Sequence, residues 1–164
     1  MQFRDRDYYR ASLDRMRQAQ TLSVGTDSYA LSMYCSGLAV ECLLRAFRWK
    51  DDKAFEGRHD LNKLLKASGI LRVNDEYMRR KGKDDEEILR ASREVRAAMN
   101  EIVILWDNNL RFASEVRLKA HLIDLNRVQG VKGDPLRKNA LDLIDAAQLI
   151  INRGIVLWDS QKKS

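Results

Sequence analysis

The stretch YALSMYCSGLAVECLLRAF, Tyr29 to Phe47, decides the fold of this chain. At 3.6 residues per turn it is apolar on almost every face, and a helix of that kind belongs at the centre of a helical bundle. Two charged residues, Glu41 and Arg45, nevertheless lie in its middle. Charges inside a bundle need a partner, so this stretch predicts both the core of the fold and a polar feature within it.

The composition of the whole chain indicates an all-α protein. Its 164 residues include one proline and eight glycines, 45% are hydrophobic and 33% are charged. Few helix breakers among many Leu, Ala, Arg, Lys, Asp and Glu residues favour helices. A chain of this length can bury a sizeable core, so we expect a single domain over residues 1–164.

Helix boundaries follow from glycines, a proline and acidic residues. Gly69 is expected to end a short helix, and Asp134 followed by Pro135 is expected to begin the last one. The expected helices cover residues 5–23, 28–49, 60–67, from 84 or 85 to 105, 115–128 and 136–158. Residues 50–57 are expected to form a polar loop, residues 70–87 a loop or insertion, and residues 160–164 a frayed tail.

The sequence argues against several classes of protein. No uninterrupted apolar run is long enough to cross a bilayer, and the charged start MQFRDRDYYR is unlike a secretory leader, so we expect a cytoplasmic protein without a membrane span. Cys35 and Cys42, seven residues apart on one helix, would be about 10 Å apart, too far for a disulfide. No Cys or His set completes a zinc site, and no phosphate-binding loop is present, so no metal or cofactor is expected.

The charge balance leaves two interpretations open. The net charge is +6 and the isoelectric point is about 9.4. An excess of positive charge favours anionic partners such as RNA, DNA or nucleotides. The 24 acidic residues are interspersed with the basic ones, however, and this pattern also fits an ordinary solvated surface of mixed charge.

Glu41 and Arg45 form the first polar group of interest. Their i to i+4 spacing has the order that favours an ion pair along a helix. One interpretation is a structural pair in which one of the two charges reaches water at the edge of the bundle. The other is that Glu41 orients an Arg or a His from another helix within a binding site.

The second group is Arg58, His59 and Asp60, directly before the short third helix. Asp60, or His59 before it, can cap that helix. His59 can also titrate near neutral pH or donate a hydrogen bond to a phosphate, and Arg58 would strengthen anion binding at the start of a helix. Both interpretations stay open.

The third group is the segment WDNNLRFA, Trp106 to Ala113, which interrupts the helical pattern. Its apolar residues are expected to anchor in the core. Arg111, among aromatic residues, is either a buried ion-pair partner or a phosphate ligand. His121 lies four positions after Arg117, so both can face one side of a helix, where such a pair is usually surface chemistry without function.

Several runs of residues carry a resemblance to a known family. They are Tyr29, Tyr34, GLAVECLLRAF from Gly37 to Phe47, GRHDLNKLL from Gly57 to Leu65, and WDNNLRFA around Arg111. Over about residues 5–158, the chain resembles a HEPN domain, the helical domain named from higher eukaryotic and prokaryotic nucleotide-binding proteins.

The resemblance implies an architecture and a set of partners. HEPN domains are up-and-down bundles of four to five core helices, often homodimeric, and we expect this all-α chain to be one. Members include toxins of toxin–antitoxin and phage-defence systems and subunits that associate with nucleotidyltransferases, and many bind RNA or nucleotides. The expected partners are therefore RNA or a nucleotide, a second copy of the chain, and a cognate antitoxin or nucleotidyltransferase protein.

The motif of the family's nucleases is not reproduced here. Those members carry an Arg, four to six further residues and then a His, usually near the last core helix, and two copies in a dimer form a metal-independent RNase site. In this chain residues 136–158 contain no His, and three residues separate Arg117 from His121, whereas nine separate Arg111 from His121. RNase activity is therefore not carried over from the resemblance.

The leading hypothesis from the sequence is a non-catalytic HEPN-like protein that binds RNA or a nucleotide, in a bacterial defence or toxin–antitoxin context. Its site would be a positive cleft at the dimer interface, in which Arg111, Arg58 and His59 contact phosphate. Glu41 would hold Arg45 or Arg111 in place. Such phosphate contacts give salt-dependent binding with little sequence preference.

Two alternatives differ in the role of the polar residues. One is a divergent ribonuclease toxin that uses Arg117 with His121, or Arg111 with His59. The other is a structural adaptor dimer without a ligand, in which the polar group around Glu41 supports the fold.

Overall fold

The structure is a computed structural model that describes residues 3–25, 28–49 and 59–162. These residues form helices joined by turns and loops, with no β-strand among them, so the prediction of an all-α chain is confirmed for this part of it. The elements are α1 (Asp5–Leu22), α2 (Tyr29–Trp49), α3 (Leu61–Ser68), α4 (Ile70–Arg80), α5 (Asp85–Leu105), the 3₁₀ helix η1 (Asn108–Phe112), α6 (Glu115–Asp124) and α7 (Pro135–Lys162).

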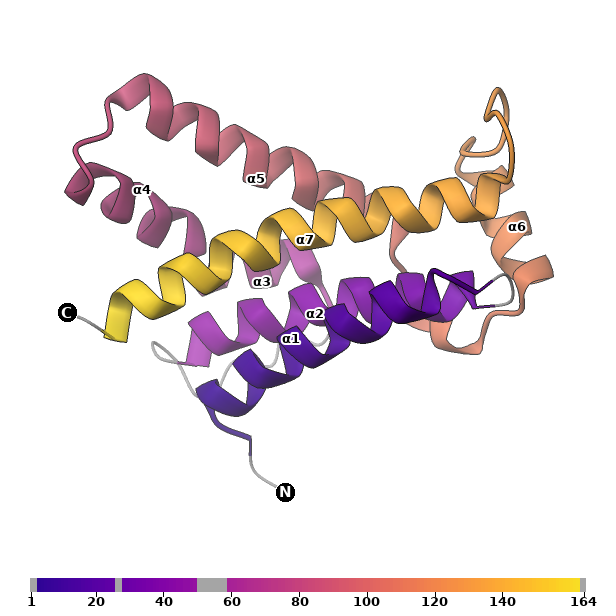
Figure 1. The fold of residues 1–164 in the computed structure, drawn as a ribbon, viewed down its shortest axis with the longest axis horizontal. Helices are drawn as coiled ribbons and strands as arrows, with labels where there is room; N and C mark the ends of the chain where they lie inside the picture. Colours follow the sequence, from indigo (N-terminus) through magenta and orange to yellow (C-terminus); the bar gives the residue numbers. More distant parts are fainter. Residues whose placement is uncertain (1–2, 26–27, 50–58, 163–164) are drawn as a thin grey trace.

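The helix α2 is the centre of the bundle, as its sequence predicts. It packs against α1, α3, α7 and η1, and Figure 1 shows α1 and α2 side by side beneath the long α7, with α5 on the other side of α7. By length and composition alone, residues Tyr29–Arg48 could cross a membrane, but 78% of that window is buried inside the structure. Such burial is typical of the central helix of a bundle.

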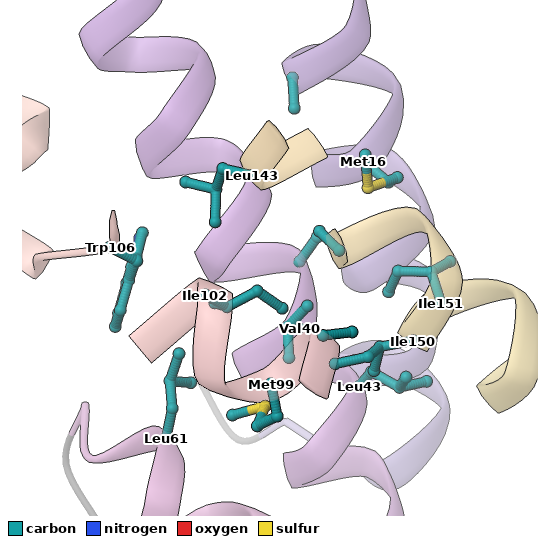
Figure 2. Close-up of a cluster of buried hydrophobic side chains, with 14 of the residues drawn as sticks. Met16, Val40, Leu43, Leu61, Met99, Ile102, Trp106, Leu143, Ile150 and Ile151 are labelled. Atoms are coloured by element: carbon teal, nitrogen blue, oxygen red, sulfur yellow. The ribbon is translucent and has the colours of Figure 1, made fainter. Parts of the chain in front are cut away.

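The core combines side chains from helices that are distant in sequence. Figure 2 shows Met16 of α1, Val40 and Leu43 of α2, and Met99 of α5 converging with residues of α7. The large side chains buried almost completely include Met33, Leu43, Leu44, Leu64, Met99, Ile102, Leu105, Leu118, Leu122, Leu143, Ile150 and Ile151. Burial of this extent by several helices is the main source of stability of such a bundle.

Gly37 allows one close approach inside this core. A Cβ atom built on Gly37 would fall well inside van der Waals distance of the indole ring of Trp106, at Cδ1, Cγ and Nε1. The indole N–H donates to the backbone oxygen of Tyr34, 3.1 Å away. The sequence predicts a close crossing of two helices at Gly37, whereas the structure places a tryptophan side chain there, directly after the end of α5.

The expectation of a loop or insertion over residues 70–87 is wrong for most of that range. Gly69, in the left-handed conformation with φ of 64°, ends α3 and at the same time precedes α4. Residues Ile70 and Val73 of α4 are buried, which gives this charged segment an apolar face that packs on α5. The charged run YMRRKGKDDEE suggested a loop. Its basic half instead belongs to the end of α4, and its acidic half belongs to the start of α5.

Other expected boundaries hold with smaller corrections. The helix α6 ends at Asp124 rather than near Val128. Asn126, two residues after that end, has a positive φ of 56°, which does not continue an α-helix. The helix α7 continues to Lys162, so the expected frayed tail is wrong as far as that residue. The expected polar loop of residues 50–57 lies outside the described residues.

The two cysteines are free thiols in the core region. Cys35 is buried and Cys42 is partly buried, and they are not joined by a disulfide, as their spacing predicts. Burial, followed by the nearby negative charge of Glu41, raises the pKa of Cys42 to about 11. A thiol with so high a pKa stays protonated near neutral pH and is a poor nucleophile.

Candidate functional site

The candidate site is built around the buried carboxylate of Glu41. Its side chain, on the central helix α2, is only 4% exposed. Oε1 accepts a hydrogen bond from Nε of Arg45 at 2.9 Å, and Oε2 lies 2.8 Å from Nδ1 of His59. The ion pair between Glu41 and Arg45 is therefore confirmed, and Glu41 also holds a histidine from another part of the chain.

His59 connects this buried pair to the surface. The residue lies just before α3, and its side chain is 46% exposed. Because Nδ1 faces the carboxylate of Glu41, a neutral imidazole carries its proton on Nδ1 and presents Nε2 as an acceptor, whereas a protonated imidazole presents Nε2 as a donor. A carboxylate behind a histidine thus fixes the ring and its tautomer, as it does in many binding and catalytic sites.

His59 lines a surface groove between the start of α3 and the end of α5. The groove, here called the His59 groove, has a volume of about 360 Å³. Its walls are formed by His59, Asp60, Leu61, Asn62, Val103, Trp106, Asp107, Asn108 and Asn109. The amide oxygen of Asn108 is buried without a hydrogen-bond partner among the described residues. An unsatisfied acceptor of this kind costs about 1–3 kcal/mol.

The carboxylates in the groove are caps of the neighbouring helices. Asp60 accepts a hydrogen bond from the backbone N–H of Lys63 at 2.9 Å, and this bond is the largest cause that lowers the pKa of Asp60 below its ordinary value. Asp107 accepts in the same way from the N–H of Asn109, at 2.7 Å. The lowered pKa keeps Asp60 negatively charged near neutral pH, so this end of the groove repels phosphate and suits groups that donate hydrogen bonds.

The expectation that Arg111 belongs to the same site is not supported by its position. Arg111 lies on η1, is exposed, and stacks on the ring of Phe112 with 4.6 Å between its guanidinium carbon and the ring centroid. It is not enclosed by aromatic residues, because Phe112 itself is 76% exposed. Glu41 binds Arg45 and His59 instead, since these two fill both of its oxygens. Arg58 lies outside the described residues.

A second hollow shares Asp107 and Asn109 with the His59 groove. It has a volume of about 180 Å³ and is lined by Asp107, Asn109, Leu110, Phe112, Ala113, Arg117, Leu118 and His121. Nε2 of His121 is buried there without a hydrogen-bond partner among the described residues. Arg117 and His121 therefore face one hollow, as their spacing predicts.

Sequence reasoning identified the Glu41, Arg45 and His59 cluster but missed other parts of the groove. Asn108 was visible only as one polar residue in a segment that breaks the helical pattern, and Asn62 gave no signal. Both reach the groove because its walls combine the start of α3 with the end of α5 and the start of η1, which are distant in sequence. A search of the described ranges for three or more His, Cys, Asp or Glu side chains able to hold a metal ion found none.

Comparisons of the chain with protein-family models, with curated proteins and with solved structures gave no match.

Proposed function

We propose that this chain is a HEPN-like helical protein that binds RNA or a nucleotide without catalysing a reaction. The observation that carries the proposal is the fixed imidazole of His59, held on one nitrogen by a buried carboxylate while its ring lines an open groove. A purely structural ion pair needs no exposed third member, since Glu41 already pairs with Arg45 inside the bundle.

The groove has the groups that read a nucleoside. The side chains of Asn108 and Asn109 offer amide donors and acceptors, which match the edges of unpaired bases. The carboxylates of Asp60 and Asp107 accept hydrogen bonds from amino groups or ribose hydroxyls. Nε2 of His59 accepts a hydrogen bond from a ribose hydroxyl when the ring is neutral. The net charge of +6 attracts an anionic ligand from solution.

The resemblance to HEPN domains supports the biological part of the proposal. It rests on the central helix with its Glu41, on the run around His59, and on the segment before Arg111. On that basis we place the protein in the bacterial cytoplasm, as a homodimer in a defence or toxin–antitoxin system, with an antitoxin or a nucleotidyltransferase protein as its partner.

Binding is tested by fluorescence anisotropy with a labelled single-stranded RNA of mixed sequence at several salt concentrations. We expect binding that weakens with salt, and a loss of at least about tenfold in affinity for His59→Ala, equal to about 1.4 kcal/mol. His121→Ala, the change at the only other histidine, is the matched control and should keep its affinity within about twofold. The proposal is contradicted if the parent binds no RNA or nucleotide, or if His59→Ala binds as well as the parent.

A divergent ribonuclease is the second candidate function, because Arg117 and His121 line one hollow and the buried Nε2 of His121 has no hydrogen-bond partner among the described residues. Phosphate stabilisation by Arg117 and proton transfer by His121 would be the chemistry of such a site. The RNA from the binding assay, run on a denaturing gel after incubation with a chelator, distinguishes the two. Intact RNA agrees with a binding protein, whereas cleavage that His121→Ala abolishes would establish the nuclease.

A further inference from the structure

A second groove, rich in positive charge, lies between α3, α4 and α5. Its volume is about 450 Å³, and its polar lining consists of Asn62, Lys66, Arg72, Arg96 and Asn100. Among the described residues, none that lines it carries a carboxylate. We call it the cationic groove. Three positive charges from three different helices face one space, which is the arrangement that binds a phosphate-bearing ligand.

The cations of this groove are largely available for a ligand. Within the described ranges, Lys66 and Arg96 have neither an ion pair nor a side-chain hydrogen bond. Arg72 pairs with Glu76 at 3.0 Å, but both side chains of that pair are more than half exposed. An exposed pair of this kind contributes little to stability and exchanges easily with a ligand.

The cationic groove adjoins the His59 groove end to end. Asn62 lines both of them, so the two grooves meet at that residue. On the α5 side, Arg96 and Asn100 line the cationic groove and Val103 lines the His59 groove. These residues are spaced i, i+4 and i+7 and therefore share one face of the helix, over about 10 Å along its axis.

The His59 groove and the cationic groove differ in charge, as the nucleosides and the phosphates of a nucleotide chain do. The His59 end has carboxylates and amides, which suit bases and ribose hydroxyls and repel phosphate. The other end has Lys66, Arg72 and Arg96, which suit phosphate oxygens. A ligand that spans both ends therefore carries a nucleoside at one end and backbone phosphates at the other.

We propose that the two grooves form one channel, between α3 and α5, that holds a short segment of single-stranded RNA. The inference rests on the proposed function and specifies its ligand class: a strand of several linked nucleotides rather than a mononucleotide. The strand is single, because the His59 end reads base edges that pairing would cover, and because about 10 Å of channel is far shorter than the duplex length that double-stranded RNA-binding domains contact. One unpaired base lies beside His59, and the following phosphates lie along Lys66, Arg72 and Arg96.

The test compares a labelled single-stranded RNA of about ten nucleotides with adenosine 5′-monophosphate, on the parent and on the double variant Lys66→Gln/Arg96→Gln. The parent should bind the oligonucleotide at least about tenfold more tightly than the mononucleotide. The double variant should lose that advantage, and its slope of log affinity against log salt should fall by about 1.4, or 0.7 for each lost phosphate contact. Mononucleotide binding should change little.

The matched control is Lys119→Gln/Arg137→Gln, which removes the same charge from exposed positions on α6 and α7. Equal melting temperatures for the two double variants show that both are folded. Oligonucleotide binding no tighter than mononucleotide binding, or equal losses in both double variants, overturns the channel but leaves a nucleotide site at His59 intact. Polyglutamate that displaces the RNA at equal charge concentration also overturns it, and indicates an acidic protein partner. Absence of any RNA or nucleotide binding by the parent removes the proposed function together with the channel.

Discussion

Replacement of Glu41 with alanine is expected to lower the free energy of unfolding by about 3 kcal/mol. The substitution leaves the guanidinium of Arg45, which is 20% exposed, without the carboxylate that accepts from its Nε, and it leaves Nδ1 of His59 without that partner. Removal of one member of a buried ion pair costs about 3–5 kcal/mol. We expect the lower end of this range of cost, because water can solvate the exposed ring of His59 once the carboxylate is gone. Urea denaturation measures the change as a shift of the midpoint at constant slope.

Two variants sharpen the test of Glu41. Glu41→Gln keeps the shape and one acceptor oxygen, so it should lose less stability than alanine but should still impair RNA binding, since a neutral amide no longer fixes the imidazole of His59 as a carboxylate does. Asp14→Ala removes the exposed pair between Asp14 and Arg17 and should cost less than about 0.5 kcal/mol. If Glu41→Gln is destabilised yet binds RNA as tightly as the parent, Glu41 supports the fold alone and the structural adaptor becomes the better account.

Replacement of Gly37 with alanine is expected to destabilise the protein by about 2 kcal/mol, although alanine is the better helix former. Alanine would gain about 1 kcal/mol in helix propensity. Its methyl group, however, would overlap the indole ring of Trp106, which is only 8% exposed. Overpacking of a core costs about 1–3 kcal/mol, and here the displaced ring also loses its hydrogen bond to the backbone oxygen of Tyr34.

Gly25→Ala provides the control for this substitution. A Cβ atom on Gly25 meets no atom closer than 3.7 Å, and its backbone has no positive φ, so that variant should match the parent in stability within about 0.5 kcal/mol. Thermal unfolding of the two variants and the parent, at one pH and salt concentration, measures the difference. A Gly37→Ala protein as stable as the parent would contradict the close packing of α2 against Trp106.

Much of the fold follows from local patterns in the sequence. The apolar run of α2 places it at the centre because no face of it suits water, and Gly69, Asp84 and Pro135 mark helix boundaries through backbone preferences that act within a few residues. The segment of α4 could not be read in this way. Its apolar face has few members among many charges, and its helical state depends on packing against α5, which is a contact between segments and leaves little local trace.

In the candidate site too, contacts within one helix could be predicted from the sequence, whereas contacts between distant segments could not. The i to i+4 spacing of Glu41 and Arg45 makes their pairing predictable, because both lie on one helix. The partnership of Glu41 with His59 was expected only as one of several options, since it depends on how the chain returns to α2 after residues outside the described ranges. Arg111 was expected to be enclosed because of its aromatic neighbours in sequence, whereas the 3₁₀ turn of η1 directs Leu110 inward and leaves Arg111 and Phe112 in solvent.

The most direct test of the central claim, that RNA binds at His59, is a histidine-ring nitrogen NMR spectrum of the protein with and without a short single-stranded RNA. The chain has only two histidines, so one substitution assigns both rings. In the free protein we expect Nδ1 of His59 to show the signature of a nitrogen bonded to the carboxylate of Glu41. RNA should then shift Nε2 of His59 and leave His121 unchanged. Saturating RNA that leaves the ring of His59 unchanged, or that shifts His121 alone, would contradict the account.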